Sequence, residues 1–175
     1  SDWRKHLDTL VRSSFQNSGQ ICLCGSRLLV ERSIHEEFRD AFVERAQALR
    51  IGDPLETGTQ LGPLVSQAQF DKVLACIQSA REEGGRVLCG GETIDRPGWF
   101  IAPTVIGGLG PESATNREEI FGPVVTLQAF DSDDEAVALA NASDYGLSAS
   151  LFTKDISRAH RLAAGLHVGM VWINT

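Results

Sequence analysis

The chain has 175 residues, of which 42% are hydrophobic, the composition of an ordinary globular domain that is long enough to bury a core. Its 16 basic residues are scattered and outnumbered by 23 acidic ones, for a formal net charge of −7, which argues against a nucleic-acid-binding surface. No apolar stretch approaches the roughly 20 residues that span a bilayer and no secretory signal is visible, so we expect a cytoplasmic protein that binds neither nucleic acid nor membrane.

Hydrophobic spacing predicts strands that alternate with helices along the chain. In chain order we expect a strand at 26–32, a helix at 33–49, a helix at 70–80, strands at 86–89, 99–106 and 124–130, a helix at 136–141, a strand at 147–153, a helix from Asp155 to about Ala164 and a strand at 168–173. Three helices are preceded by a serine with Glu or Gln three residues later, the pattern of a capping box, at Ser33, Ser66 and Ser132. The Gly/Pro-rich segment 51–65 is expected to be a connection between helices.

Alternating strands and helices are typical of an α/β fold, and we expect a largely parallel, twisted sheet with flanking helices. Functional sites in such sheets lie in loops beyond the strand ends. The sequence stops at VWINT, directly after an apolar strand. We therefore expect a domain that is truncated.

The four cysteines could form disulfides, bind a metal, fill a core or act as nucleophiles. Disulfide frameworks belong to short secreted chains, and Cys22 and Cys24 are too close to bridge without strain. Cys76 lies in a predicted helix and Cys89 in a predicted strand, neither with a nearby histidine, so we predict no metal site. Free cysteines usually pack as small hydrophobic residues, and this is our interpretation of Cys24, Cys76 and Cys89.

Cys22 differs because it ends the polar, glycine-containing stretch NSGQIC, directly before an apolar strand. A thiol in that position can be exposed and surrounded by backbone N–H groups, which lower its pKa and stabilise the oxyanion formed when the thiolate attacks a carbonyl. The residues by themselves leave a packing role open. None of the four histidines is singled out as a partner, so a Cys–His dyad also stays open.

The segment SFQNSGQICLCGSR resembles the active-site segment of the NAD(P)-dependent aldehyde dehydrogenase superfamily, with Phe15, Asn17, Gly19, Gln20 and Cys22 at the family's spacing. GDPLETGTQLGPLVSQAQFDKV, GWFIAPTV, REEIFGPVV, YGLSASLFTKD and GMVWIN are similar to further stretches of the family, so the resemblance covers essentially the whole chain. It implies that residues 1–175 form part of the family's catalytic domain, truncated at both ends. The cofactor-binding domain and the C-terminal oligomerisation segment would lie outside the chain.

The resemblance also implies a mechanism and a set of site residues. Cys22 would attack an aldehyde to give a thiohemiacetal, hydride would pass to NAD or NADP, and the resulting thioester would be hydrolysed to a carboxylic acid. The resemblance assigns Glu119 to the nicotinamide ribose hydroxyls, Phe121 to the nicotinamide ring and, as weaker matches, Gln69 and Lys72 to the same ribose. Without it, Glu119 and Lys72 would be interpreted as exposed surface and Phe121 as core.

The resemblance implies that the family's general-base glutamate would lie before Ser1 and that its oxyanion-hole asparagine would also lie outside the chain. We therefore expect the chain by itself to bind no cofactor tightly and to turn over little aldehyde. The full-length enzyme is expected to be a homo-oligomer that acts on a small-molecule aldehyde.

The substrate branch is suggested by VRSSFQNSGQICLCGSR, in which Arg12 and the CLC step resemble enzymes that oxidise 2-hydroxymuconic and 2-aminomuconic semialdehydes. Betaine-aldehyde and broad-specificity members share much of the same segment. Two alternatives remain. One is a non-catalytic paralogue or interaction module that kept the fold, and the other is a fragment with weak esterase activity at Cys22.

Overall fold

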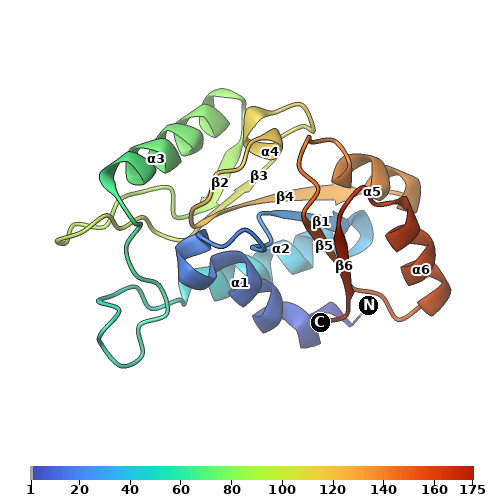
Figure 1. Ribbon diagram of the computed structural model, residues 1–175, viewed down its shortest axis with the longest axis horizontal. Helices are drawn as coiled ribbons and strands as arrows, with labels where there is room; N and C mark the ends of the chain where they lie inside the picture. Colours follow the sequence, from blue (N-terminus) through green and yellow to red (C-terminus); the bar gives the residue numbers. More distant parts are fainter. Residues whose placement is uncertain (1) are drawn as a thin grey trace.

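The computed structural model describes residues 2–175, which form an alternation of helices and strands (Figure 1). The helical elements are η1 (Trp3–His6), α1 (Leu7–Phe15), η2 (Gln16–Gly19), α2 (Arg32–Gln47), α3 (Gln67–Glu82), α4 (Ala114–Arg117), α5 (Asp133–Ala140) and α6 (Ile156–Gly165). The strands are β1 (Arg27–Glu31), β2 (Arg86–Cys89), β3 (Thr104–Gly107), β4 (Val124–Phe130), β5 (Ser148–Leu151) and β6 (Met170–Ile173). Within these residues, no helix is both long and apolar enough to cross a membrane.

The main sheet has four strands in the order β1-β4-β3-β2, and β5 pairs with β6 in a second, two-stranded sheet. Strand β4 lies between β1 and β3 and is parallel to both, and β5 is parallel to β6. Strand β2 is antiparallel to β3 and lies at the edge of the main sheet. The predicted α/β fold with a largely parallel sheet is confirmed.

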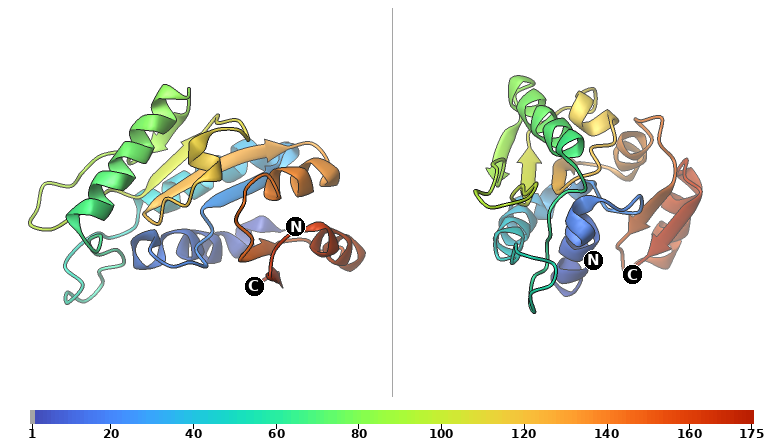
Figure 2. Two further views of the ribbon diagram at one scale, coloured as in Figure 1. Left: turned by 45° about the horizontal axis from the view of Figure 1, so that its top comes forward. Right: turned by 60° about the vertical axis from the view of Figure 1, so that its left-hand side comes forward.

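Helices cover both faces of the main sheet, with α1 and α2 on one face and α3 on the other (Figures 1 and 2). Neighbouring residues of one strand belong to different hydrophobic clusters: Val105 packs with α1 and α2, and Ile106 packs with α3. In β4, Val125 likewise belongs to the cluster with α1 and α2, and Val124 belongs to the cluster with α3. Because side chains alternate along a strand, each central strand buries both of its faces, which explains their continuous apolar runs.

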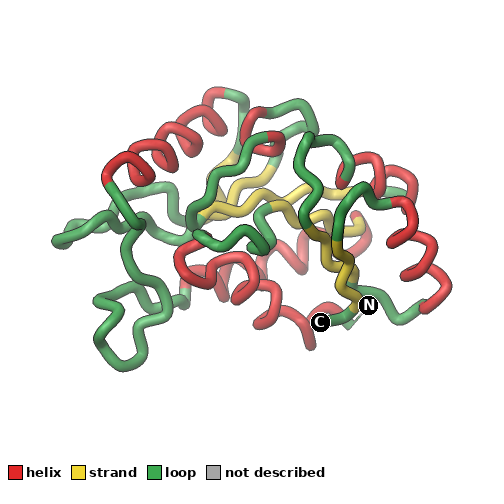
Figure 3. The backbone as a smooth tube through the Cα atoms, viewed as in Figure 1, coloured by secondary structure: helices red, strands yellow, loops and turns green. Residues whose placement is uncertain are grey.

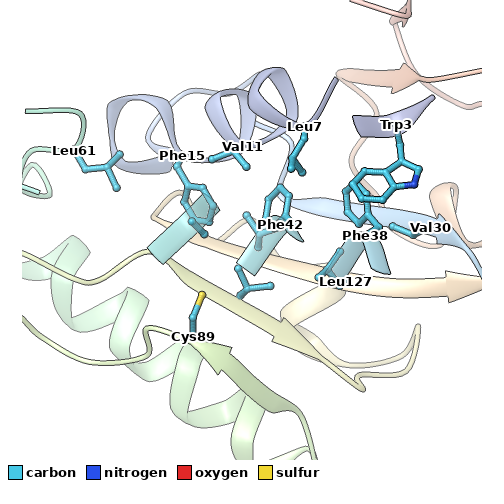
Figure 4. Packing of buried hydrophobic residues seen from close by; sticks show 13 residues of the cluster. Trp3, Leu7, Val11, Phe15, Val30, Phe38, Phe42, Leu61, Cys89 and Leu127 are labelled. Atoms are coloured by element: carbon cyan, nitrogen blue, oxygen red, sulfur yellow. The ribbon is translucent and has the colours of Figure 1, made fainter. Parts of the chain in front are cut away.

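The cluster on the α1/α2 face is built around aromatic side chains (Figure 4). Phe42 is fully buried, and its ring centroid lies 5.7 Å from that of Phe38 and 6.1 Å from that of Phe15. Trp3 packs edge-on against Phe38 at 5.4 Å. Such aromatic pairs stabilise the fold beyond what the burial of their surface area contributes. The cluster therefore fixes α1, whose last residue is Phe15, on α2.

Helix α1 is absent from the predicted elements, although the sequence carries a signal for it. Leu7, Val11 and Phe15 recur every four residues and are all buried. This spacing places them on one helical face. The signal is short, because the helix has nine residues and ends at the irregular stretch that follows.

Two of the three predicted serine caps are confirmed. The hydroxyl of Ser66 accepts a hydrogen bond from the backbone N–H of Gln69 at 3.2 Å, at the start of α3. Ser132 does the same for Glu135 at the start of α5, also at 3.2 Å. These bonds satisfy N–H groups that have no partner within the helix.

The predicted cap at Ser33 is wrong. Strand β1 passes directly into α2, which begins at Arg32, with Glu31 at the cap position and no side-chain cap bond. Ser33 therefore lies within the first turn, and its hydroxyl donates to the Glu31 carboxylate at 3.1 Å instead. Without a loop between strand and helix, the extended cap conformation falls two residues earlier than the serine.

The predicted strand at 99–106 is shorter at its beginning, because β3 starts at Thr104, directly after Pro103. Proline has no N–H for a strand ladder. The segment 51–65 is a loop, as predicted, and an isolated bridge between Ile51 and Leu61 closes it. Figure 3 shows this connection between α2 and α3 extending away from the sheet.

We predict that Phe42→Ala lowers the free energy of unfolding by about 3–5 kcal/mol, because it removes a fully buried ring and leaves a cavity. Leu55→Ala, at a side chain that is 94% exposed, is the control and should change it by less than about 0.5 kcal/mol. Urea unfolding followed by circular dichroism measures both. Equal effects of the two substitutions would contradict the assigned core.

Candidate active site

The cysteine turn, residues 17–24, connects α1 to β1 and has a left-handed backbone at three consecutive positions. Asn17, Ser18 and Gly19 have φ of 52°, 55° and 72°. This conformation is unfavourable for residues with a Cβ, so hydrogen bonds must hold it. The Ser18 hydroxyl donates to the carbonyl of Gly62 at 2.7 Å, which ties the turn to the loop before α3.

Gln20 braces the same turn from two sides. Its side-chain carbonyl accepts from the backbone N–H of Val65 at 2.9 Å, and its amide donates to the Asn17 carbonyl at 3.2 Å. The Asn17 side chain in return donates to the Gln20 carbonyl at 3.2 Å. These contacts give the polar residues before Cys22 a structural role that their spacing did not reveal.

Cys22 is exposed at the end of this turn, where the Cys24 N–H donates to the Ile21 carbonyl at 2.9 Å. Burial raises the pKa of the Cys24, Cys76 and Cys89 thiols, which lowers the fraction of thiolate that each holds at neutral pH. Cys24 is half-buried, with Sγ 3.7 Å from the Gln16 carbonyl, and Cys89 is buried in β2, with Sγ 3.6 Å from the Pro103 carbonyl. Cys22 is therefore the most exposed cysteine of the four.

The glutamate loop, residues 118–122, lies between α4 and β4 and carries the predicted residues Glu119 and Phe121. Glu119 is exposed, whereas Phe121 is half-buried and has a left-handed backbone with φ of 57°. That conformation is rare for an aromatic residue. The loop is thus another strained segment that its neighbours must hold.

Helix α3 holds the glutamate loop through the other two predicted residues. The amide of Gln69 donates to the carbonyls of Ile120 at 3.0 Å and Phe121 at 2.8 Å. The Lys72 ammonium donates to the Glu119 carbonyl at 2.7 Å. These hydrogen bonds bring all four predicted residues together, and each of the bonds goes to the backbone of the loop.

The cysteine turn and the glutamate loop touch at two glycines. A Cβ added to Gly19 would lie 1.9 Å from the carbonyl oxygen of Gly122, and a Cβ added to Gly122 would lie 2.5 Å from Cγ2 of Val73 in α3. Such distances leave no room for a side chain, so the two backbones and α3 are in direct contact. This contact joins the segment of Cys22 to the segment of Glu119 and Phe121.

The sheet topology explains why two segments so far apart in the sequence meet. The cysteine turn leads into β1 and the glutamate loop leads into β4, and these strands are parallel neighbours. The amino ends of parallel neighbours lie at one edge of a sheet. The candidate site therefore lies beyond the amino ends of these strands.

The histidines lie on or next to helices: His6 in η1, His35 in α2, His160 in α6 and His167 after α6. None of the side-chain hydrogen bonds within residues 2–175 joins one of them to Cys22. Within the same residues, no group of three or more His, Cys, Asp or Glu side chains could hold a metal ion.

A hollow of about 630 Å³ opens between α1, α2 and the loop before α3, and Cys22 is not among its lining residues. Arg12, singled out in the sequence, is exposed on α1 and lines this hollow together with Gln16. Its other lining residues are Asp8, Val11, Phe15, Arg45, Ala48, Leu49, Gln60 and Leu61.

Comparison with known proteins identifies relatives along the whole chain. The model of the aldehyde dehydrogenase family matches residues 1–175. A betaine aldehyde dehydrogenase of Cereibacter sphaeroides is 47% identical over 174 residues, which are 99% of this chain and 36% of the relative. A 2-aminomuconic 6-semialdehyde dehydrogenase of a Pseudomonas species is 44% identical over 180 residues, covering 99% of this chain and 36% of the relative.

Solved structures give the same result. The crystal structure of betaine aldehyde dehydrogenase from Staphylococcus aureus in complex with NAD+ matches with a TM-score of 0.96 and 36% sequence identity, over 99% of this chain and 35% of that one. The chain thus spans about a third of the length of the proteins that it matches.

We predict that Gly19→Ala displaces the cysteine turn from the glutamate loop, because the new Cβ would overlap the Gly122 carbonyl and the left-handed backbone would be strained. The free energy of unfolding should fall by about 2–4 kcal/mol. Gly110→Ala, where an added Cβ meets no atom within 4 Å, is the matched control. Urea unfolding compares the two, and equal stability would contradict the glycine contact.

Proposed function

The chain belongs to the aldehyde dehydrogenase family, and we propose that residues 1–175 are part of the catalytic domain of an NAD(P)-dependent enzyme that oxidises an aldehyde to its carboxylic acid. The observation that carries the proposal is the contact of Gly19 with Gly122, because the accessible Cys22 then belongs to the same edge of the sheet as Glu119 and Phe121. A cytoplasmic location, a homo-oligomeric state and further domains of the complete enzyme remain predictions.

In the proposed reaction, the Cys22 thiolate forms a bond to the carbonyl carbon of the aldehyde and gives a thiohemiacetal. Exposure of Cys22 at the end of a braced turn supports this role, because a small aldehyde can reach the sulfur. The backbone N–H of Cys22 is proposed to donate to the oxyanion. After hydride loss Cys22 holds the acyl group as a thioester, which water hydrolyses to release the acid and restore the thiol.

The cofactor, NAD or NADP, supplies the hydride acceptor when it is bound. The residues of the glutamate loop fit such a group: the exposed Glu119 carboxylate can accept hydrogen bonds from two neighbouring ribose hydroxyls, and the half-buried Phe121 offers an aromatic surface to a planar ring. Gln69 and Lys72 lie beside the same loop and remain predicted neighbours of the ribose. The Staphylococcus aureus relative was solved in complex with NAD+.

For the substrate we propose the muconic semialdehyde class. A Pseudomonas relative is a 2-aminomuconic 6-semialdehyde dehydrogenase at 44% identity, and Arg12 with the Cys22–Leu23–Cys24 step resembles that branch. Betaine aldehyde dehydrogenases reach 47%, so overall identity does not separate the two classes. Their substrates differ in charge, because a muconic semialdehyde carries a carboxylate that guanidinium groups bind, whereas betaine aldehyde is a quaternary ammonium that aromatic faces bind.

We predict that Cys22→Ala in the complete enzyme lowers aldehyde-dependent NADH formation by at least about 10³-fold, because the nucleophile is lost. Cys24→Ala, two residues away at a half-buried thiol, is the control and should retain activity within a few fold. Iodoacetamide should also alkylate Cys22 faster than the other three cysteines, measured by peptide mass spectrometry. Equal alkylation rates, or an active Cys22→Ala enzyme, would reject Cys22 as the nucleophile.

We predict that kcat/KM of the complete enzyme is at least about tenfold higher for 2-hydroxymuconic semialdehyde than for betaine aldehyde, a difference of about 1.4 kcal/mol in transition-state binding. Steady-state absorbance assays at fixed cofactor concentration measure both. The reverse ratio would assign the enzyme to the betaine aldehyde class, while the role of Cys22 is decided by the previous experiment.

A further inference from the structure

Gln69 makes contacts that set it apart from the other glutamines of α3. It is half-buried in the first turn, and its backbone N–H is fixed by the Ser66 cap. Its side-chain amide donates to two consecutive backbone carbonyls, those of Ile120 and Phe121, at 3.0 and 2.8 Å. Gln67 and Gln78 instead donate to exposed carboxylates on their own helix.

The two carbonyls that Gln69 binds belong to the strained part of the glutamate loop. Phe121 has φ of 57°, a backbone conformation that an aromatic residue adopts only when its surroundings impose it. The carbonyl of Phe121 and the one before it are aimed at the same nitrogen of Gln69. Without these bonds, the carbonyls of Ile120 and Phe121 would lose the partner that holds them in this conformation.

Other contacts hold the glutamate loop before and after Phe121. Ile120 is buried against α3, and Gly122 is in contact with Gly19 and Val73. The Pro123 carbonyl accepts from the N–H of Thr104, which fixes the start of β4. The Lys72 ammonium also binds the loop, at the Glu119 carbonyl, but from an exposed position where water competes for the bond.

We propose that Gln69 is a positioning residue, which holds the backbone of residues 120 and 121 so that Glu119 and Phe121 are oriented before the cofactor arrives. Gln69 then contributes to cofactor affinity through the loop, by reducing the ordering that binding requires. The part of the proposal that concerns affinity rests on the proposed function. The part that concerns the loop stands on the hydrogen bonds of Gln69 and is measured without cofactor.

The test uses the complete enzyme with Gln69→Leu, which removes the amide, and Gln69→Glu, which faces the two carbonyls with a carboxylate. Gln78→Leu, at an exposed glutamine of the same helix, is the matched control. In cofactor-free protein, amide hydrogen exchange of the peptide that covers 118–123 should become about tenfold faster in both Gln69 variants, the change expected when two hydrogen bonds are lost. Exchange elsewhere, the melting temperature and all properties of Gln78→Leu should stay unchanged.

Calorimetric titration with NAD should then give a Kd about tenfold higher in the Gln69 variants, whereas kcat at saturating NAD should change by less than about threefold. Lys72→Met should accelerate exchange of the loop less than Gln69→Leu does. A weaker NAD affinity with unchanged loop exchange would overturn the proposal in favour of a direct cofactor contact. Faster exchange with unchanged affinity, or faster exchange throughout with a lower melting temperature, would also overturn it. If the unaltered enzyme binds no NAD, the proposed function fails, and loop exchange alone still decides whether Gln69 holds the loop.

Discussion

The contact between the backbones of Gly19 and Gly122 is the constraint on which the candidate site depends. It brings together two segments that each contain strained, left-handed residues, and it leaves no space for a side chain on Gly19. Because Gly122 also packs on Val73, the contact includes α3. The helix that supplies Gln69 and Lys72 is therefore placed by the same contacts that place the cysteine turn against the glutamate loop.

The sheet makes this contact possible. Strands β1 and β4 are parallel neighbours, so the segments that lead into them begin at the same edge. The α1/α2 cluster, with Phe15 at the end of α1, fixes the start of the cysteine turn, and the α3 cluster fixes the far side of the glutamate loop. The two cores on opposite faces of one sheet thus hold the two halves of the site.

Cys22 is the exposed cysteine of the four, and burial raises the pKa of the Cys24, Cys76 and Cys89 thiols. The polar residues before Cys22 are used to hold an unfavourable backbone, through Ser18 and Gln20, and so keep the sulfur at the surface. We propose that this thiol is the group that reacts with the aldehyde. The same residues that the family resemblance identified as a motif are, in physical terms, the supports of a strained turn.

The sequence by itself determined the α/β class, the caps at Ser66 and Ser132 and the family, because these depend on local hydrogen bonds, on hydrophobic spacing and on short motifs around Cys22 and Glu119. The sequence misplaced the start of α2, because β1 passes directly into this helix without a loop. It missed α1, because the apolar pattern of this nine-residue helix is short. Only the tertiary structure decided that Gln69 binds two carbonyls of a distant loop and that Gly19 meets Gly122. The physical reason is that these contacts join segments far apart in the chain, and their geometry is set by the packing of helices on a sheet rather than by any local preference.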